Sequence, residues 1–252
     1  MAADWSPLTR ELAQWRAEGR DLPVWWRDDD ARAATPALDR LVTLSARLDL
    51  PLHLAVVPAG ADTSLRDVAR LPHVIPLVHG WAHRNHAPAG GKKSEFPQDR
   101  AVAYGEAGSG RYRLAALFGD DLLPVFVPPW NRIGDDLVPR LAGLGYAGLS
   151  TFTPRRDRLA APGLVRINTH LDPIDWRGGG GLLAEDALTA LLVGLLQDRR
   201  HGRTDATEPL GLLTHHLVHD AAIWSFVERV AGRLLEGGAR PVNLWETREA
   251  LP

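Results

Sequence analysis

Residues 22–57 read LPVWWRDDDARAATPALDRLVTLSARLDLPLHLAVV, and this stretch indicates the class of fold. Its first part, Leu22–Trp26, is apolar and rich in residues that favour a β-strand. A helix is expected from Thr35–Pro36 to about Leu48, and a second apolar strand at Leu52–Val57. Strands that are apolar on both faces and separated by a helix are typical of a buried parallel sheet.

The alternation of strands and helices continues along nearly the whole chain. Further strands are expected at Val74–Val78, Val125–Val127, Ala147–Thr151, Leu164–Ile167, Leu210–Leu213 and Val242–Leu244. Further helices are expected at Ser64–Arg70, Asp99–Phe118, Asp135–Leu144, Glu185–Arg200 and Ala221–Leu235. Roughly seven or eight such units favour a barrel over an open sheet. No linker divides the chain, so we predict a single domain over residues 1–252, with a short helix at residues 7–18 preceding the barrel.

The composition limits the partners of the protein. Lys and Arg number 29 against 31 Asp and Glu, which gives a net charge of −2, so bulk electrostatics does not attract nucleic acid. The N-terminal segment lacks the apolar core of a signal peptide, and no apolar run approaches the ~18 residues of a membrane helix. We therefore expect a cytoplasmic protein with neither nucleic acid nor a membrane as a partner. The oligomeric state does not follow from the sequence.

Polar residues gather where the predicted strands end. These clusters are Arg27–Asp30, His79–His86, Pro128–Arg132, His170–Trp176 and His215–Asp220. In parallel α/β barrels, the active site is built from the loops that follow the strands. Five separate segments would therefore meet at one mouth of the barrel, which predicts a catalytic site there. Because the chain has no cysteine, any metal in that site must be held by nitrogen and oxygen ligands.

Two of these clusters have the residue types of a metal site. The segment His79-Gly-Trp-Ala-His83 places two imidazoles four residues apart, and on a helical turn they would share one face. The alternative is a pair of surface or capping histidines. The run Asp28–Asp30 brings three carboxylates together, which is unfavourable unless a cation or an arginine offsets the charge. A solvated loop is the alternative there, and His86 is left open as a ligand, a supporting residue or a loop residue.

Five motifs occur in a fixed order. An Asp-Asp pair follows the first strand, the H-x-x-x-H pair follows the third, and Pro128-Pro-Trp130 follows the fourth. Asp172-Pro-Ile-Asp-Trp176 and Leu213-Thr-His215 come later. From about Trp25 to His216, this arrangement resembles the NodB-like polysaccharide deacetylases, the type of carbohydrate esterase family 4. The resemblance implies an α/β fold with a single distorted (β/α) barrel of about seven parallel strands, and metal-dependent removal of acetyl groups from N- or O-acetylated sugars.

The resemblance also implies roles for single residues. Asp28 is similar to the general base that activates water. Asp29, His79 and His83 are similar to the ligands of a divalent metal ion, expected to be Zn²⁺, with Co²⁺, Ni²⁺ or Mn²⁺ as alternatives. Three protein ligands leave positions for water and for the acetyl carbonyl oxygen.

The acid side of the reaction is assigned in the same way. His215 is similar to the late histidine that protonates the leaving nitrogen, and Asp175 lies in the segment that supports it. Trp130 and Trp176 are expected to contact the sugar, because indole faces stack on sugar rings. Arg132 is a further candidate for substrate binding. The expected partner is therefore an acetylated sugar or oligosaccharide, whose identity and N- or O-acetyl linkage the sequence does not specify.

The match to the family has departures. Asp30 stands where a glycine usually follows the Asp pair, so the assignment of the acidic run is open by one residue. In the shifted register, Asp29 is the base and Asp30 the ligand. The roles of His216 and His219, which follow the late histidine, are also left open.

A further departure concerns the partner of the base. Val127 occupies the position of the arginine expected before Pro128, and we predict that Arg27 or Arg132 pairs with the acidic run instead. Three other functions remain as alternatives. They are a barrel hydrolase that acts on another C–N amide bond, a catalytically impaired carbohydrate-binding relative, and a non-haem iron oxygenase, which the strand–helix alternation disfavours.

Overall fold

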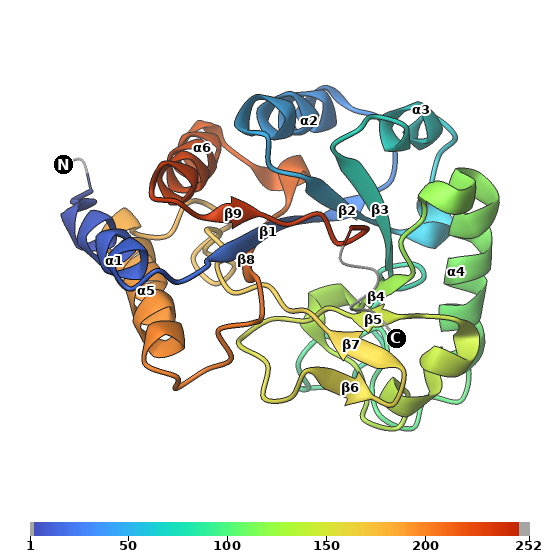
Figure 1. The fold of residues 1–252 in the computed structure, drawn as a ribbon. Coiled ribbons are helices and arrows are strands. Elements are labelled where there is room, and N and C mark those ends of the chain that lie inside the picture. Colours follow the sequence, from blue (N-terminus) through green and yellow to red (C-terminus); the bar gives the residue numbers. More distant parts are fainter. Residues whose placement is uncertain (1–2, 247–252) are drawn as a thin grey trace.

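The computed structural model describes residues 3–246, so the two ends of the predicted domain, residues 1–2 and 247–252, lie outside the described residues. The strands are β1 (Pro23–Ala31), β2 (Leu52–Val56), β3 (Val74–His79), β4 (Val125–Val127), β5 (Gly148–Leu149), β6 (Leu159–Ala161), β7 (Leu164–Arg166), β8 (Leu210–Thr214) and β9 (Arg240–Pro241). The α-helices are α1 (Ser6–Ala17), α2 (Pro36–Leu48), α3 (Leu65–Ala69), α4 (Ala103–Phe118), α5 (Glu185–Arg200) and α6 (Ala221–Glu236). The helices lie around the outside of the sheet (Figure 1).

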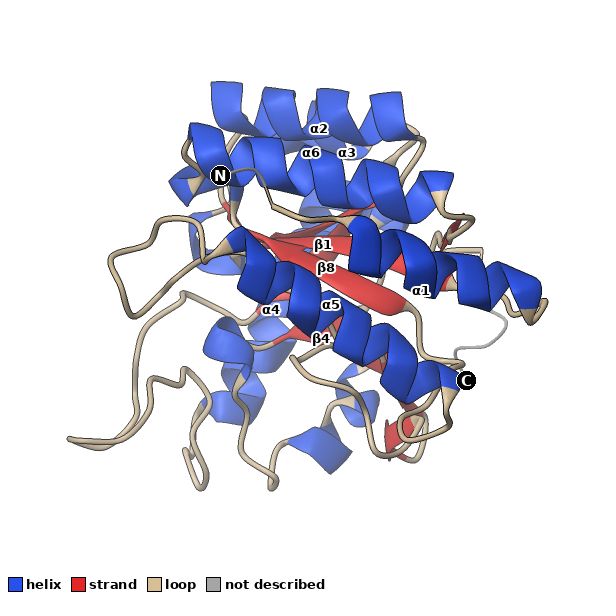
Figure 2. Ribbon diagram, turned by 90° about the vertical axis from the view of Figure 1, so that its left-hand side faces the viewer, coloured by secondary structure: helices blue, strands red, loops and turns tan. Residues whose placement is uncertain are grey.

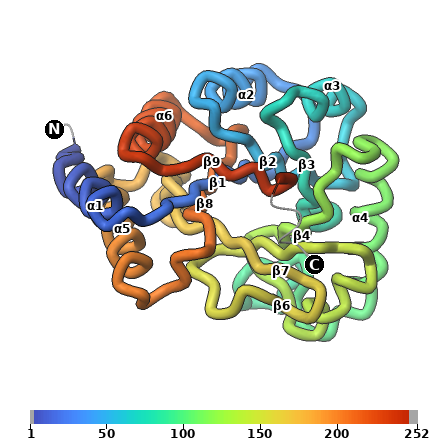
Figure 3. The backbone as a smooth tube through the Cα atoms, viewed as in Figure 1, coloured from blue at the N-terminus to red at the C-terminus, as the bar shows by residue number. Residues whose placement is uncertain are grey.

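The strands form one curled sheet. Its order is β6-β7-β5-β4-β3-β2-β1-β8, and all neighbours are parallel except the β6–β7 pair. β8 and β9 both pair with β1, so the last part of the chain lies beside the first strand (Figure 3). A single bridge from Phe152 to Thr169 continues the β5–β7 pairing, and one from Leu171 to Leu212 joins the segment after β7 to β8, at the other end of the sheet. The prediction of a distorted (β/α) barrel of about seven parallel strands is confirmed.

The two faces of the sheet carry separate cores. Trp26 and Val78 belong to the cluster that includes the helix residues, so they face outward. Trp25 and Leu77, one residue earlier on the same strands, belong to a second cluster made mainly of strand residues, which fills the barrel. Successive side chains of a strand point to opposite faces. Once one residue of a regular strand is placed inside or outside the barrel, the directions of the other side chains of that strand follow.

The N-terminal helix is part of the packed structure. α1, predicted at residues 7–18, lies side by side with α5 across β8 (Figure 2). Its residues Leu8, Leu12 and Trp15 are buried in the outer core. Arg200 of α5 forms ion pairs with Glu11 and Glu18, at 2.7 Å in each case.

Several elements differ from the sequence predictions. β1 continues beyond Trp26 to Ala31, so the acidic run lies on the strand and not in the loop after it. The helix expected over residues 135–144 is replaced by two 3₁₀ turns, Val138–Arg140 and Ala142–Leu144. Pro139 explains this change, because proline inside a helix loses one hydrogen bond and clashes with the preceding turn. Within residues 3–246, no helix has both the length and the apolar character needed to cross a bilayer.

Candidate active site

His79 is the last residue of β3 and lies on the interior face, two residues after Leu77. Its Nδ1 is 3.0 Å from the carbonyl oxygen of Val127, which can only accept, so Nδ1 carries the proton. Its Nε2 points to Asp30, with 3.2 Å to Oδ1. Burial lowers the pKa of His79, but the charges of Asp29 and Asp30 raise it by more, so the net shift is upward.

His83 reaches the same point from a bend. Gly80 and His83 have φ angles of 58° and 57°, so the segment between the two histidines is not the helical turn that the sequence suggested. The Nε2 atom of His83 is 3.1 Å from Oδ1 of Asp30, and its ring packs on Trp130 with 4.3 Å between ring centroids. The pKa of His83 is lowered, first by burial and then by the charge of His79.

Asp30 owes its direction to an irregularity of β1. The pairing of β1 with β2 shifts between Asp28 and Ala31, and Asp30 has a φ of 77°. This break in the strand turns the carboxylate of Asp30 toward the two histidines. Burial raises the pKa of Asp30, but the hydrogen bond and charge of His79 and the charge of His83 lower it by more, so the carboxylate is held ionised.

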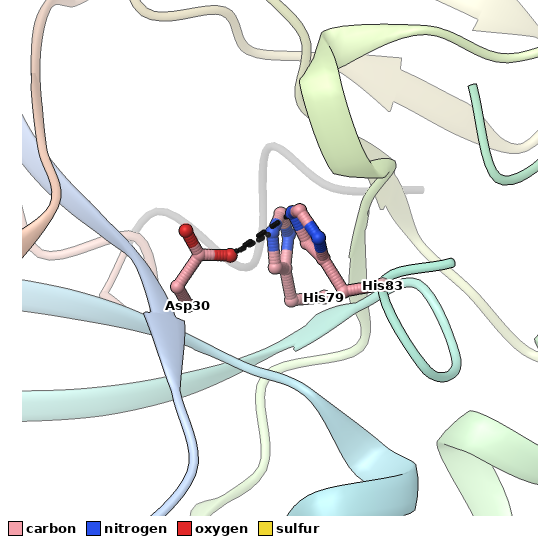
Figure 4. Close-up of side chains that lie close together, drawn as sticks. All are labelled: Asp30, His79 and His83. Atoms are coloured by element: carbon pink, nitrogen blue, oxygen red, sulfur yellow. Dashed lines mark hydrogen bonds and ion pairs between the residues drawn. The ribbon is translucent and has the colours of Figure 1, made fainter. Parts of the chain in front are cut away.

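Asp30, His79 and His83 therefore form one compact group (Figure 4). One ligand atom from each lies within 4.8 Å of the others, and no other group of at least three His, Asp or Glu in the described residues meets this criterion. Two imidazole nitrogens and a carboxylate suit Zn²⁺ and similar divalent ions. The donor chemistry and the tautomer fixed at His79 thus fit the predicted metal ion, with Asp30 in place of the expected Asp29.

Asp29 is bound by Arg27 instead. Arg27 contacts both carboxylate oxygens, from Nε to Oδ1 and from Nη2 to Oδ2, each at 2.9 Å. The side chains are 0% and 3% exposed, and both lie on the interior face with Trp25. The prediction that Arg27 or Arg132 pairs with the acidic run is confirmed for Arg27. Arg132 is exposed and donates to the carbonyl oxygen of Lys93.

The remaining donors of Arg27 tie it to other strand ends. Nη1 donates to the Ser150 hydroxyl at 2.7 Å and to the Thr151 carbonyl at 3.2 Å. Nη2 donates to Oδ1 of Asn131 at 2.7 Å. Arg27 therefore connects β1 with the segments after β4 and β5, and it supplies from β1 the guanidinium that Val127 cannot.

Asp28, the expected base, points to the outer face. Its Oδ2 accepts hydrogen bonds from the Thr214 hydroxyl at 2.6 Å and the His216 N–H at 3.0 Å, and its Oδ1 is 2.5 Å from Nδ1 of His216. Burial raises the pKa of Asp28, but the charge and hydrogen bond of His216 lower it by more. The geometry thus disagrees with the first register and favours the shifted one, because strand alternation turns Asp28 away from the interior.

His215 follows β8 on the interior side. Thr214, the last residue of β8, is paired with Asp28 and points outward. His215 comes next and therefore lies on the interior side, as Asp29 does. The ring of His215 packs edge-on against Trp176, with 4.8 Å between centroids. Its backbone N–H donates to His219, while its own buried Nδ1 has no hydrogen-bond partner among the described residues.

Trp176, which packs on His215, is bound to Asp172, whereas no contact of Asp175 with His215 is found among the described residues. The indole N–H of Trp176 donates to Oδ2 of Asp172 at 2.8 Å. Burial raises the pKa of Asp172, and the charge of His215 acts against this shift. Asp175 instead accepts the backbone N–H groups of Arg177 and Gly178, which closes a local turn.

The expected substrate residues lie in different surroundings. Trp176 is 54% exposed beside His215, and Trp130 is half-buried on His83. Trp130 has a φ of 57°, a left-handed conformation that nothing in the sequence signalled. His86 is exposed and lies outside the group formed by Asp30 and the two histidines.

Known proteins resemble this chain in structure and not in sequence. No family model and no curated protein matches the sequence. Among solved structures, a peptidoglycan N-acetylglucosamine deacetylase superimposes with a TM-score of 0.58 at 15% identity, over 90% of this chain and 87% of that chain. A family 4 acetyl xylan esterase from Clostridium thermocellum, in complex with a cobalt ion, gives 0.52 at 12% identity, over 91% and 92%. The chain has the fold of the carbohydrate deacetylases.

This fold also occurs without activity. A carbohydrate esterase family 4 pseudoenzyme from Bacillus anthracis gives a TM-score of 0.52 at 13% identity, over 89% of this chain and 65% of that chain. At such identities the likeness concerns the fold alone, and the chemistry must be argued from the residues of this chain.

Proposed function

We propose that the chain is a metal-dependent hydrolase of the NodB-like polysaccharide deacetylase type, which removes acetyl groups from an N- or O-acetylated sugar or oligosaccharide. The observation that carries this proposal is the meeting of Asp30, His79 and His83 beside the interior Arg27–Asp29 pair. In this proposal, the three residues of the group hold one divalent ion, Zn²⁺ before Co²⁺, Ni²⁺ or Mn²⁺. When bound, such an ion polarises the acetyl carbonyl and acidifies water.

Asp29 is the proposed general base, in the shifted register. It lies on the interior face next in sequence to the ligand Asp30, and each of its oxygens keeps a lone pair beyond the bond to Arg27. It takes the proton of the attacking water as the water oxygen bonds to the acetyl carbon. Arg27 fixes the carboxylate plane and offsets its charge in a site with little solvent.

His215 is the proposed general acid. As the C–N bond breaks, its imidazolium gives a proton to the nitrogen, so the sugar leaves as a neutral amine and acetate remains. Trp176 packs on the His215 ring and donates its indole N–H to Asp172, so we propose that Asp172 supports the acid through Trp176. We assign to Asp172 the supporting role that the family resemblance implied for Asp175.

The sugar is proposed to lie between Trp130 and Trp176. Trp130 borders the metal ligand His83, and Trp176 borders His215, so the two indoles flank the two halves of the reaction. Arg132, exposed near the same loop, remains a candidate for contacts to a longer substrate. A cytoplasmic location and the single-domain boundaries at residues 1–252 stay predictions.

The carbohydrate-binding alternative is favoured by one observation, the missing arginine at Val127. Against this alternative, Arg27 of β1 binds Asp29 and so supplies a guanidinium to the acidic run. Hydrolysis of another C–N amide bond would use the same groups. Substrate profiling therefore has to include amides other than acetylated sugars.

The test combines metal content with acetate release. We expect the purified protein to bind one divalent ion and to release acetate from N-acetylglucosamine oligosaccharides or acetylated xylan. A chelator should abolish this activity, and added Zn²⁺ or Co²⁺ should restore it. His83→Ala should lose both metal and activity, whereas a matched change at the exposed histidine outside the group, His86→Ala, should lose neither. Full metal loading without acetate release from a panel of N- and O-acetylated sugars would contradict the deacetylase. Turnover of other amides would then favour the second hydrolase, and no turnover at all would favour the binding protein.

A further inference from the structure

Glu95 is a fully buried carboxylate outside the catalytic group. It is 0% exposed and lies in the loop of residues 80–102, whose residues 88–93 are exposed. Its Oε1 accepts the backbone N–H groups of Ala82 at 2.7 Å and Arg84 at 3.2 Å, and its Oε2 accepts that of Trp81 at 3.0 Å. Three backbone donors on one carboxylate are the bonds that a buried charge needs to be satisfied.

These three donors flank His83. The bend that carries His83 has no helix or strand to hold its N–H groups, so the carboxylate replaces secondary structure there. Gly80 shows how close the fit is. A Cβ at Gly80 would lie 2.3 Å from Oε2 of Glu95 and 2.5 Å from Cδ of Pro129, and the residue has a positive φ. The bend therefore depends on a glycine at its start and a carboxylate at its centre.

Glu95 is itself held in place from both sides. Ser94 donates its backbone N–H to Asn85 and its hydroxyl to the Arg132 carbonyl. Phe96 is fully buried, packs on Phe126 with 5.2 Å between centroids, and bridges to Ile133. The carboxylate thus reaches the bend from a segment anchored to the barrel core and to the loop after β4.

We propose that Glu95 is a positioning residue that fixes the His83 bend and so preorganises the metal ligand, without contacting the metal itself. This inference rests on the proposed function, because it takes Asp30, His79 and His83 as the ligands. Residues that orient metal ligands typically change affinity by about 10–100-fold when they are altered. His79 is already fixed by its strand and by Val127, so His83 is the ligand that needs support.

The test measures the affinity for Zn²⁺, with a chelating indicator as competitor. In Glu95→Gln, one carboxylate oxygen becomes an NH₂ group that faces backbone donors, and we expect Zn²⁺ binding to weaken by about 10–100-fold. Gly80→Ala should weaken binding as well, because a Cβ there would collide with the Glu95 carboxylate and with Pro129 and would strain a residue of positive φ. Because the two changes share the Glu95 contact, the double variant should be weakened by less than the product of the two single effects.

The control separates positioning from general stability. Glu208 is also 0% exposed and also accepts backbone N–H groups, from Arg155 and Asn168, but it lies in another part of the barrel. Glu208→Gln should lower the melting temperature and leave the Zn²⁺ affinity unchanged. If Glu95→Gln does not fold, Glu95→Asp takes its place, because it keeps the charge but draws the carboxylate back from the three backbone donors, and it should also weaken Zn²⁺ binding.

The outcomes separate this inference from the proposed function. If His83→Ala does not change Zn²⁺ binding, the proposed metal site is wrong. If His83→Ala weakens binding but the folded Glu95 variant binds Zn²⁺ as the unchanged protein does, the metal site stands and the positioning role of Glu95 is refuted, whatever the effect of Gly80→Ala.

Discussion

At the scale of single residues, the alternation of side chains along β1 separates Asp28, which faces outward, from Asp29, which faces the interior. Trp25, Arg27 and Asp29 lie on one face of β1 and Asp28 on the other, and the packing of Trp25 in the barrel shows that the face of Asp29 is the interior one. The prediction of Asp28 as the base came from matching the acidic run to the Asp-Asp pair of the family, with the register left open by one residue. The direction of Asp30 does not follow from the alternation, because it comes from a break in the strand and a positive φ.

The first prediction follows from this division of roles. Asp29→Asn should lower turnover by roughly 10²–10⁴-fold, because an amide cannot take up the proton of water, while the metal content stays the same. The variant should be assayed with metal analysis on the same sample. Loss of metal in Asp29→Asn would show that Asp29 is a ligand after all.

Asp28→Asn is the matched comparison for Asp29→Asn. It breaks the buried pair with His216, so we expect the free energy of unfolding to fall by about 3 kcal/mol. Turnover per folded molecule should fall far less than in Asp29→Asn. A loss of turnover at Asp28 that equals the loss at Asp29, without a change in stability, would restore Asp28 as the base.

At the scale of elements, the sequence predicted the strands better than the connections. The apolar runs at β2, β3, β4 and β8 lie within about one residue of their predicted places, because buried parallel strands are marked by composition alone. The bend between His79 and His83 was taken for a helical turn, since spacing carries no information about Glu95, which lies twelve residues after His83. Turns held by a distant side chain have no local signal.

A second prediction concerns the segment that closes the barrel. Glu208 accepts hydrogen bonds from the backbone of Arg155 and Asn168 and lies 3.2 Å from Nε2 of His170, all within the buried part of the chain. Arg199 donates to its carbonyl oxygen as well. We expect Glu208→Gln to lower the free energy of unfolding by about 3 kcal/mol, because the buried guanidinium of Arg199 loses the negative charge of Glu208. Urea denaturation measures this, and a loss below 1 kcal/mol would mean that the cluster does not hold the closure.

At the scale of the whole molecule, the alternation of strands and helices was enough to predict the barrel, because parallel neighbours need crossover helices. It did not predict how the barrel closes. The closure uses a single bridge, Leu171 to Leu212, in place of a full strand pair, and β6 is antiparallel. Such short pairings are too brief to give an apolar run in the sequence.

The last prediction concerns His53, which is buried inside the barrel against Trp25. Its Nδ1 donates to the Trp26 carbonyl, and its Nε2 accepts the backbone N–H of Leu244. Burial lowers the pKa of His53 to about 4 from an ordinary value of 6.5, so the folded protein keeps this ring neutral. The unfolded chain takes up the proton first as the pH falls.

Stability should therefore be complete above about pH 6.5 and decline as the pH falls toward 4, by up to about 3 kcal/mol from His53 alone. Burial also lowers the pKa values of His170 and His219, so these two residues contribute to the loss of stability of the unchanged protein at low pH. His53→Gln keeps an acceptor for Leu244 but cannot titrate. Urea denaturation of both metal-free proteins at pH 7 and pH 5 gives their free energies of unfolding. The excess stability of the unchanged protein over His53→Gln should be smaller at pH 5 than at pH 7. Parallel declines in the two proteins would show that protonation of His53 does not control the acid stability of the barrel.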